Sequence, residues 1–207
     1  ARAAQWLEAA AERLKAKVRA PKESGPKTDA LYTDAVSAQR PPAELGIAPG
    51  KSLTLRAALG TAMGYLNNLT HGAFLACAAD LLESTSISAV GGSFPKGFFN
   101  ARSNPTSRLV PVGGICEDAM GGVMAGVSSF GFHVGVTSSY SAFIAALEHI
   151  PARLHAIGQQ ARREATKEPF RPWIMVNAHA GPMTGEDGPT HADPQPLQLL
   201  AGNFPKG

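Results

Sequence analysis

The sequence predicts an α/β fold in which a parallel β-sheet carries helices on both faces. Short apolar runs alternate along the chain with longer segments that have helical spacing, which is the order of strand–helix–strand units. The runs do not alternate between polar and apolar residues, as expected of strands that are covered on both sides. The predicted strands are residues 73–79, 108–112, 132–136 and 173–178.

The first 50 residues are expected to lie outside this sheet domain. Residues 21–50 are rich in Pro, Lys, Ser and Gly, a composition that predicts a linker rather than a packed element. Residues 1–20 have the spacing of an exposed helix with a narrow apolar stripe. That stripe consists of Trp6, Leu7, Leu14 and Val18.

The first half of the sheet domain is predicted to contain a helix, a strand and a long loop. Residues 52–69 suit a helix because apolar side chains recur on one of its faces. The strand at 73–79 ends at Asp80, and the loop after it includes the segment GGSFPKGFFNARSNP at 91–105. The next predicted strand, 108–112, is weakened by Pro111, which has no backbone N–H to donate.

The second half repeats the alternation. Residues 117–130 predict a helix rich in small residues, and a strand at 132–136 follows it. Residues 140–165 predict a helix or a broken pair of helices, because Pro151 interrupts the pattern. After the strand at 173–178, residues 194–201 predict a last helix.

Composition restricts the classes of partner. The chain has 207 residues, 44% of them hydrophobic, and a formal charge of +3. This mild basic excess is local, and no basic stripe with interleaved aromatics predicts nucleic-acid binding. No run approaches the roughly 18 apolar residues of a membrane span, and the first residues lack the features of a secretory signal. Cytoplasmic localisation without membrane association is expected.

The two cysteines, Cys77 and Cys116, are too few for a disulfide scaffold. Both lie in apolar segments, so buried free thiols in a reducing compartment are the simplest interpretation.

Polar and aromatic residues follow each predicted strand. Because ligands bind beyond the carboxyl ends of parallel strands, these residues form the candidate site. They are Asp80, Glu117, Tyr140, Phe143, His179, Asp187 and His191.

Each candidate also has a purely structural interpretation. Asp80 can cap a turn, and Glu117 can stabilise a helix N-terminus. Tyr140 and Phe143 can be core residues. A metal site on His179, Asp187 and His191 is an alternative, although their spacing fits no standard zinc pattern. Phosphate-cradle and serine nucleophile motifs are absent from the sequence.

Two stretches resemble the pyrimidine-binding domain of the transketolase family. They are GICEDAMGGVMAGVSSFG at 114–131 and GEDGPTH at 185–191, and the resemblance runs from residue 52 to about residue 205. It implies the thiamin-diphosphate-binding fold, and hence the cofactor thiamin diphosphate with Mg²⁺ or Ca²⁺. We expect the metal ligands on a diphosphate-binding domain or chain, and none on this chain.

The resemblance also implies a role for each matching residue. Glu117 would contact N1′ of the aminopyrimidine, and Asp80, in CAADLLES, would lie near the cofactor. Tyr140 and Phe143 would enclose the pyrimidine ring, while a third family aromatic is replaced by Ala146.

On the substrate side, the resemblance implies that His179, Asp187 and His191 line the channel and contact sugar hydroxyls or phosphate. Arg56 and Ser84 match sugar-phosphate-binding positions. Glu117, His179 and His191 are the expected catalytic residues, since histidines suit proton transfer near neutral pH. Departures from the family are Cys116 in place of an arginine, an unfamiliar segment at 91–105, and a longer segment after Tyr140.

These features together predict a transketolase-like component that transfers a two-carbon ketol unit from a ketose (phosphate) to an aldose. Residues 1–20 would form the helix that closes a preceding diphosphate-binding domain, and residues 21–50 would form a linker. Residues 51–207 would form the pyrimidine-binding domain, without the family's C-terminal domain. A homodimer or heterotetramer would complete the site. The alternatives are a non-catalytic or regulatory subunit, and a thiamin-diphosphate enzyme with another acceptor.

Overall fold

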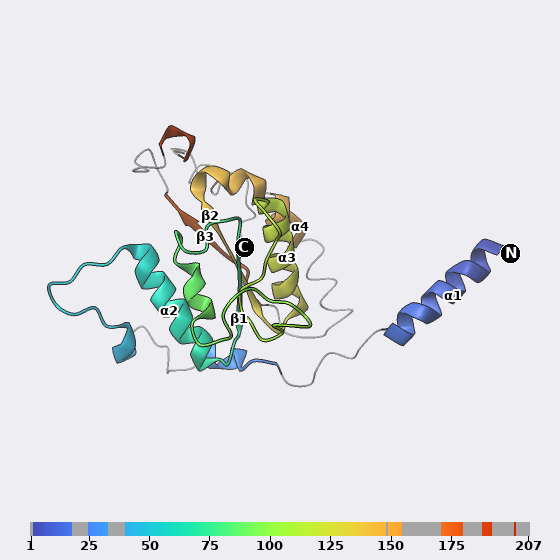
Figure 1. Cartoon of the computed structure of the whole chain (residues 1–207), viewed down its shortest axis with the longest axis horizontal. Coiled ribbons are helices and arrows are strands. Elements are labelled where there is room, and N and C mark those ends of the chain that lie inside the picture. Colours follow the sequence, from blue (N-terminus) through green and yellow to red (C-terminus); the bar gives the residue numbers. More distant parts are fainter. Residues whose placement is uncertain are drawn as a thin grey trace.

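A three-stranded parallel sheet forms the centre of the molecule, which confirms the predicted α/β class. The computed structural model describes residues 2–17, 25–32, 40–147, 149–154, 171–179, 188–191 and 201. The strands are β1 (Phe74–Ala78), β2 (Val134–Tyr140) and β3 (Ile174–Ala178), in the order β1-β2-β3 (Figure 1). Their carboxyl ends therefore lie along one edge of the sheet.

Two strand predictions differ from the structure. β2 extends to Tyr140, past the predicted end at 136, because its polar residues Thr137, Ser138 and Ser139 are buried. Residues 108–112 do not form a full strand. They contribute one parallel bridge, in which Ala76 N–H donates to the Arg108 carbonyl at 2.9 Å and Val110 N–H donates to the Ala76 carbonyl at 2.8 Å. The pairing does not continue past Val110.

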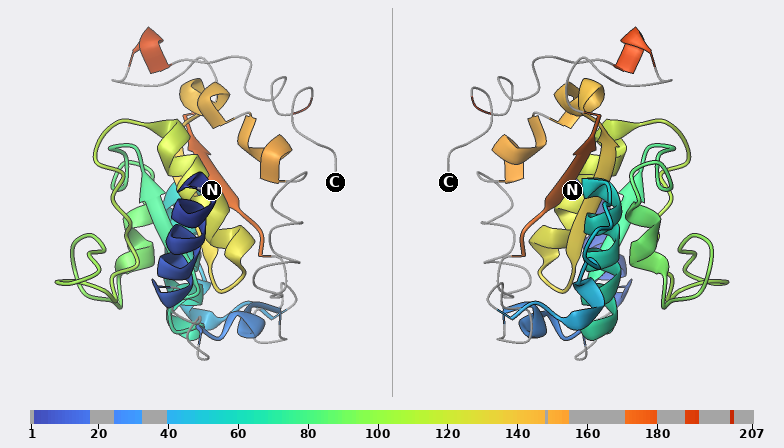
Figure 2. Two further views of the ribbon diagram at one scale, coloured as in Figure 1. Left: turned by 90° about the vertical axis from the view of Figure 1, so that its right-hand side faces the viewer. Right: turned by 90° about the vertical axis from the view of Figure 1, so that its left-hand side faces the viewer.

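Helices cover both faces of the sheet (Figure 2). On one face, α2 (Leu55–Leu69) and the 3₁₀-helix η4 (Ile87–Gly91) pack on the sheet. On the other face lie α3 (Glu117–Phe130), η5 (Ser141–Leu147) and α4 (His149–Arg153). The first core contains Met63, Phe74, Ala76, Ile87, Val90, Val134, Val136 and Val176. The second contains Cys77, Ala79, Met120, Met124, Ala125, Leu147 and Ile150.

The helix predictions at 52–69 and 117–130 agree with the structure. The one at 140–165 agrees only in being broken, because Pro151 lies inside α4 rather than at the break, and residues 155–165 lie outside the described residues. The helix expected at 52–69 is α2, which Thr54 caps by accepting the Ala57 N–H, and the helix expected at 117–130 is α3. The region expected to be helical from 140 begins with the last residue of β2 and then breaks into η5 and α4. Of the expected helix at 194–201, all but the last residue lies outside the described residues.

A buried asparagine fastens α2 to the sheet. The Asn67 side chain is fully buried and donates to the Val90 carbonyl at 2.7 Å, while its oxygen accepts the Phe74 N–H at 2.7 Å. Buried polar groups are stable only when they are hydrogen-bonded, and Asn67 meets that condition. It thereby fixes the start of β1 against α2 and η4.

The N-terminal region is partly attached to this domain. The expected helix is α1 (Arg2–Lys17), whose Trp6 side chain is 67% exposed and which stands apart from the sheet (Figure 1). Part of the expected linker, however, is packed. The 3₁₀-helix η1 (Thr28–Tyr32) places Leu31 against the first core, and Lys27 N–H donates to the Thr70 carbonyl at 2.8 Å. A short η3 (Ala43–Leu45) precedes α2.

The segment at 91–105 is an ordered turn. Asn100 and Asn104 form an antiparallel bridge, and Asn104 Nδ2 donates to the carbonyls of Lys96 and Phe98 at 2.9 and 3.1 Å. The Ser107 hydroxyl donates to the Gly97 carbonyl at 2.6 Å. These bonds hold the loop together, and Phe99 N–H joins it to the Leu109 carbonyl at 2.6 Å.

Candidate functional site

Four predicted site residues form one cluster of rings at the carboxyl edge of the sheet. Tyr140, the last residue of β2, is 5% exposed and stacks on His179 with ring centroids 4.2 Å apart. The His191 ring lies edge-on to both Tyr140 and Phe143, at 5.4 Å from each. The cluster thus joins the end of β2, η5, the residue after β3 and the short η8 (Pro189–His191).

The backbone bends sharply after two strands to present this site. Asp80 follows β1 with φ 68°, and His179 follows β3 with φ 55°. Non-glycine residues in this left-handed region carry a conformational cost and concentrate at functional sites. In the GEDGPTH stretch, Gly188 has φ 72° and begins the turn that carries His191, whereas Asp187 lies outside the described residues.

Arg56 connects this cluster to the loop after β1. Its Nη1 donates to the Ser84 carbonyl at 2.8 Å and lies 3.2 Å from His179 Nε2. Arg56 belongs to the first turn of α2, so the sheet brings together three residues that are far apart in sequence. Ser84 takes part through its backbone oxygen, while its hydroxyl donates to the Leu81 carbonyl at 3.3 Å.

Glu117 begins α3 and is half-buried. The Ser139 hydroxyl donates to Glu117 Oε1 at 3.1 Å, and Ser139 itself is 1% exposed. Successive side chains of a strand point to opposite faces, so Ser139 and Tyr140 face different sides of β2. The sequence did not single out Ser139, because one serine within the polar stretch 137–139 carries no recognisable motif.

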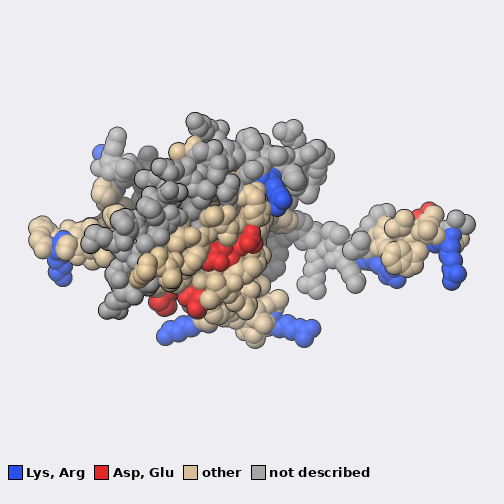
Figure 3. All heavy atoms as spheres, turned by 90° about the horizontal axis from the view of Figure 1, so that it is seen from above, with Lys and Arg blue, Asp and Glu red and all other residues tan. Residues whose placement is uncertain are grey.

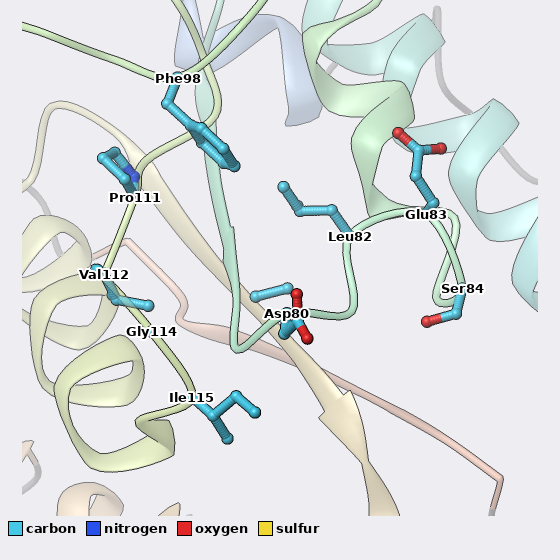
Figure 4. A pocket seen from close by; sticks show the side chains of 11 residues that line it. Asp80, Leu82, Glu83, Ser84, Phe98, Pro111, Val112, Gly114 and Ile115 are labelled. Atoms are coloured by element: carbon cyan, nitrogen blue, oxygen red, sulfur yellow. The ribbon is translucent and has the colours of Figure 1, made fainter. Parts of the chain in front are cut away.

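A cavity of about 810 Å³ lies between the end of β1 and the loop that precedes α3. In Figure 4 the side chains of Leu82, Phe98 and Ile115 surround Asp80, which lies at the centre of the group. Phe98 comes from the 91–105 turn and was not predicted as a site residue. Its signal in the sequence is only that it is one of two adjacent aromatics in a loop. The lining residues are Ala78, Asp80, Leu82, Glu83, Ser84, Phe98 and 111–115.

These residues fit part of the cofactor that the resemblance implies. A half-buried carboxylate, two aromatic rings and a partly apolar cavity are suited to an aminopyrimidine and its adjoining ring. A diphosphate needs cations or a bound metal, and the described residues contain no group of three His, Cys, Asp or Glu that could hold a metal ion. The described part of the chain therefore fits the ring portion of thiamin diphosphate, and among its residues there is no metal cluster of this kind for the diphosphate.

The two cysteines differ in environment. Cys77 is buried in β1, and burial raises the pKa of its thiol to about 12. Cys116, at the N-cap of α3 beside Glu117, is exposed, so the prediction that both thiols are buried is wrong for Cys116. Residues 113–116, in the loop before α3, are exposed. The apolar residues of this segment therefore predicted burial incorrectly.

Surface charge is scattered on the face seen from above (Figure 3). Within the described residues of that face, Lys and Arg side chains lie mostly at the margins, and Asp and Glu side chains gather nearer the centre. None of the helices in the described part of the chain is long and apolar enough to cross a membrane. The expectations of no nucleic-acid partner and of cytoplasmic localisation stay predictions.

Comparison with known proteins identifies the sheet domain. Residues 51–202 match the family described as transketolase, pyrimidine binding domain. A comparison with curated protein sequences gives no significant match.

Solved transketolases have the same fold at low sequence identity. The structure from Campylobacter jejuni has a TM-score of 0.59 at 22% identity, with 77% of this chain and 22% of that chain covered. The Pichia stipitis enzyme, in complex with sedoheptulose-7-phosphate, gives 0.57 at 20%, with 76% and 22% covered. The Leishmania mexicana enzyme gives 0.53 at 21%, with 72% and 20% covered. The chain thus spans about a fifth of the length of these proteins.

Proposed function

The chain belongs to the transketolase pyrimidine-binding domain family, and on that basis we propose that it is one component of a thiamin-diphosphate-dependent enzyme of the transketolase type. The enzyme would move a two-carbon ketol unit from a ketose (phosphate) donor to an aldose acceptor. One observation carries this proposal: Arg56, Tyr140, His179 and His191, from four separate segments, are in contact at the carboxyl edge of the sheet.

The cofactor side of the site comprises Glu117, Asp80, Tyr140 and Phe143. When bound, thiamin diphosphate supplies the nucleophilic carbon and the electron sink of the reaction. Glu117, held by Ser139, would contact N1′ of the aminopyrimidine, and Tyr140 and Phe143 would supply aromatic surface to its ring. Asp80, which lines the cavity after β1, would lie near the cofactor.

The substrate side comprises Arg56, Ser84, His179, Asp187 and His191. Arg56 is suited to a substrate phosphate, because a guanidinium binds phosphate oxygens through charge-assisted hydrogen bonds. His179 and His191 would orient sugar hydroxyls and hold or move protons there, because imidazole titrates near neutral pH. Asp187 would accept hydrogen bonds from substrate hydroxyls.

A second domain or chain would complete the site. The described residues offer no cluster for Mg²⁺ or Ca²⁺, and the chain spans about a fifth of the solved transketolases. We therefore propose that the diphosphate and its metal bind to a diphosphate-binding domain or subunit, in a homodimer or heterotetramer. An assay of this chain mixed with a candidate diphosphate-binding chain tests that arrangement.

Substitution of Glu117 tests the proposed chemistry. In the assembled enzyme, Glu117→Ala is expected to abolish cofactor-dependent ketol transfer, because the contact to N1′ is lost. Asp118→Ala is the matched control, since Asp118 is the next residue in the same helical turn and its side chain is exposed. Near-normal turnover of Glu117→Ala, measured as product formed from a ketose phosphate and an aldose, would contradict the proposal.

Two other functions are tested by the same mixture. A non-catalytic or regulatory subunit, which would show no activity with any partner, is one of them, because the described residues include no metal cluster for a diphosphate. The ordered turn that places Phe98 in the cavity wall supports a thiamin enzyme with another acceptor. Product analysis with ketose and 2-oxo-acid donors distinguishes that enzyme from a transketolase.

A further inference from the structure

The contact between Arg56 and His179 restricts where the imidazole proton can be. Arg56 Nη1 lies 3.2 Å from His179 Nε2. A guanidinium in a protein stays protonated and has only donors. Nε2 must therefore be the acceptor in this hydrogen bond, and an accepting ring nitrogen carries no proton.

The donor is held in place by a second bond from the same nitrogen. Nη1 carries two hydrogens, and it also donates to the Ser84 carbonyl at 2.8 Å. One of these hydrogens is donated to the Ser84 carbonyl and the other to His179 Nε2. Because the Ser84 acceptor is a backbone oxygen, it keeps its position whatever side chain stands at residue 84.

The acceptor ring is equally restrained. His179 leaves β3 with φ 55°, and its ring stacks on Tyr140 at 4.2 Å with 30° between the ring planes. Tyr140 is 5% exposed and belongs to β2. A ring held on a buried aromatic presents a defined nitrogen to Arg56.

We infer that Arg56 is a positioning residue that holds His179 as a neutral imidazole with its proton on Nδ1. In the proposed function, on which the consequence for catalysis rests, His179 then contributes a hydrogen-bond donor through Nδ1 while Nε2 is engaged. Arg56 therefore has a second role besides the phosphate contact proposed for it.

Nitrogen NMR of the whole chain with ¹⁵N-labelled histidine tests the inference without cofactor or partner. His179→Gln assigns the His179 signals among the six histidines. At pH 8, above the ordinary histidine pKa of about 6.5, wild type should show an unprotonated Nε2 and a protonated Nδ1. Arg56→Met should lose this pattern, because imidazole without a directing partner favours a proton on Nε2. Arg56→Lys, which keeps a cationic donor, should restore part of it.

Ser84→Ala is the control and should leave the His179 signals unchanged, since the carbonyl acceptor remains. A protonated Nε2 in wild type would overturn the inference, and this measurement needs only the assignment variant His179→Gln to fold. An unchanged His179 pattern in Arg56→Met would overturn it as well. Absence of ketol transfer by an assembled enzyme in which His179 has the expected pattern would overturn the proposed function alone.

Discussion

Two adjacent serines at the end of β2 have different surroundings. Ser138 and Ser139 are each 1% exposed, but they point to opposite faces of the sheet. Ser139 donates to Glu117 at 3.1 Å, whereas the Ser138 hydroxyl has no hydrogen-bond partner among the described residues. Substituting each serine in turn therefore distinguishes loss of the hydrogen bond to Glu117 from loss of a buried serine hydroxyl.

Ser139→Ala is expected to lower the turnover of the assembled enzyme about tenfold. A hydrogen bond contributes about 0.5–3 kcal/mol, depending on the charge of its partners, and about 1.4 kcal/mol corresponds to a factor of ten in rate. Ser139→Thr, which keeps the hydroxyl, should retain most of the activity. The measurement is kcat for ketol transfer at saturating cofactor.

Ser138→Ala should change kcat less than about twofold, because an unpaired hydroxyl contributes no orienting bond. Equal losses in the two alanine variants would assign the effect to packing of β2 rather than to Glu117. Urea unfolding of both variants measures that packing effect separately.

At the scale of single residues, the sequence predicted which residues lie near the carboxyl edge of the sheet better than it predicted their contacts. Glu117, Tyr140, His179 and His191 were expected because they follow apolar runs, and the parallel sheet does bring its strand ends to one edge. The partners Ser139 and Phe98 were missed, because their positions depend on the pairing of β2 and on the fold of the 91–105 turn. Neither has a local signature.

At the scale of elements, α3 packs unusually close to β2. A Cβ at Gly135 would overlap the backbone carbonyl of Met124, so only glycine allows this approach. The Ser128 hydroxyl accepts the Gly135 N–H at 2.8 Å and donates to the Pro172 carbonyl at 2.9 Å. This bridge ties α3 to β2 and to the residues before β3.

Gly135→Ala should destabilise the chain by about 3 kcal/mol, near the upper end of overpacking costs, because backbone atoms of α3 cannot move aside as a side chain can. Gly122→Ala is the matched control. It lies in α3 with open space around it, and alanine there should stabilise by about 0.5–1 kcal/mol through helix propensity. Urea unfolding monitored by circular dichroism measures both. Equal stability of Gly135→Ala and wild type would disprove the close packing.

The types of elements were predictable and some of their ends were not. α3 was expected to begin at Glu117 and does, since its small residues have clear helical spacing. β2 was expected to end at 136 because Thr137, Ser138 and Ser139 look like the start of a loop. Their burial between β1 and β3 keeps them in the strand, and burial of this kind follows from tertiary pairing rather than from local propensity.

At the scale of the whole molecule, some residues before 51 pack on the sheet domain. Thr28 is 5% exposed and Leu31 packs on the core between α2 and the sheet. Buried Arg171 donates through Nε to the Gly131 carbonyl at 3.0 Å and lies 3.7 Å from Asp29. Composition predicted a linker from 21 to 50 because the segment is rich in Pro, Lys, Ser and Gly, and composition does not reveal that one leucine packs on the core.

Two truncations test this boundary. A chain that begins at Gly25 should unfold at the same urea concentration as the full chain, because Trp6 and Leu7 of the removed α1 are exposed. A chain that begins at Arg40 should lose about 1–2 kcal/mol of unfolding free energy, a large part of what burial of one leucine side chain contributes. Asp29→Ala in the full chain is the control for the ion pair and should cost less than about 1 kcal/mol, because Asp29 is exposed and such pairs are weak. Equal midpoints for the two truncations would mean that residues 25–32 do not belong to the folded domain.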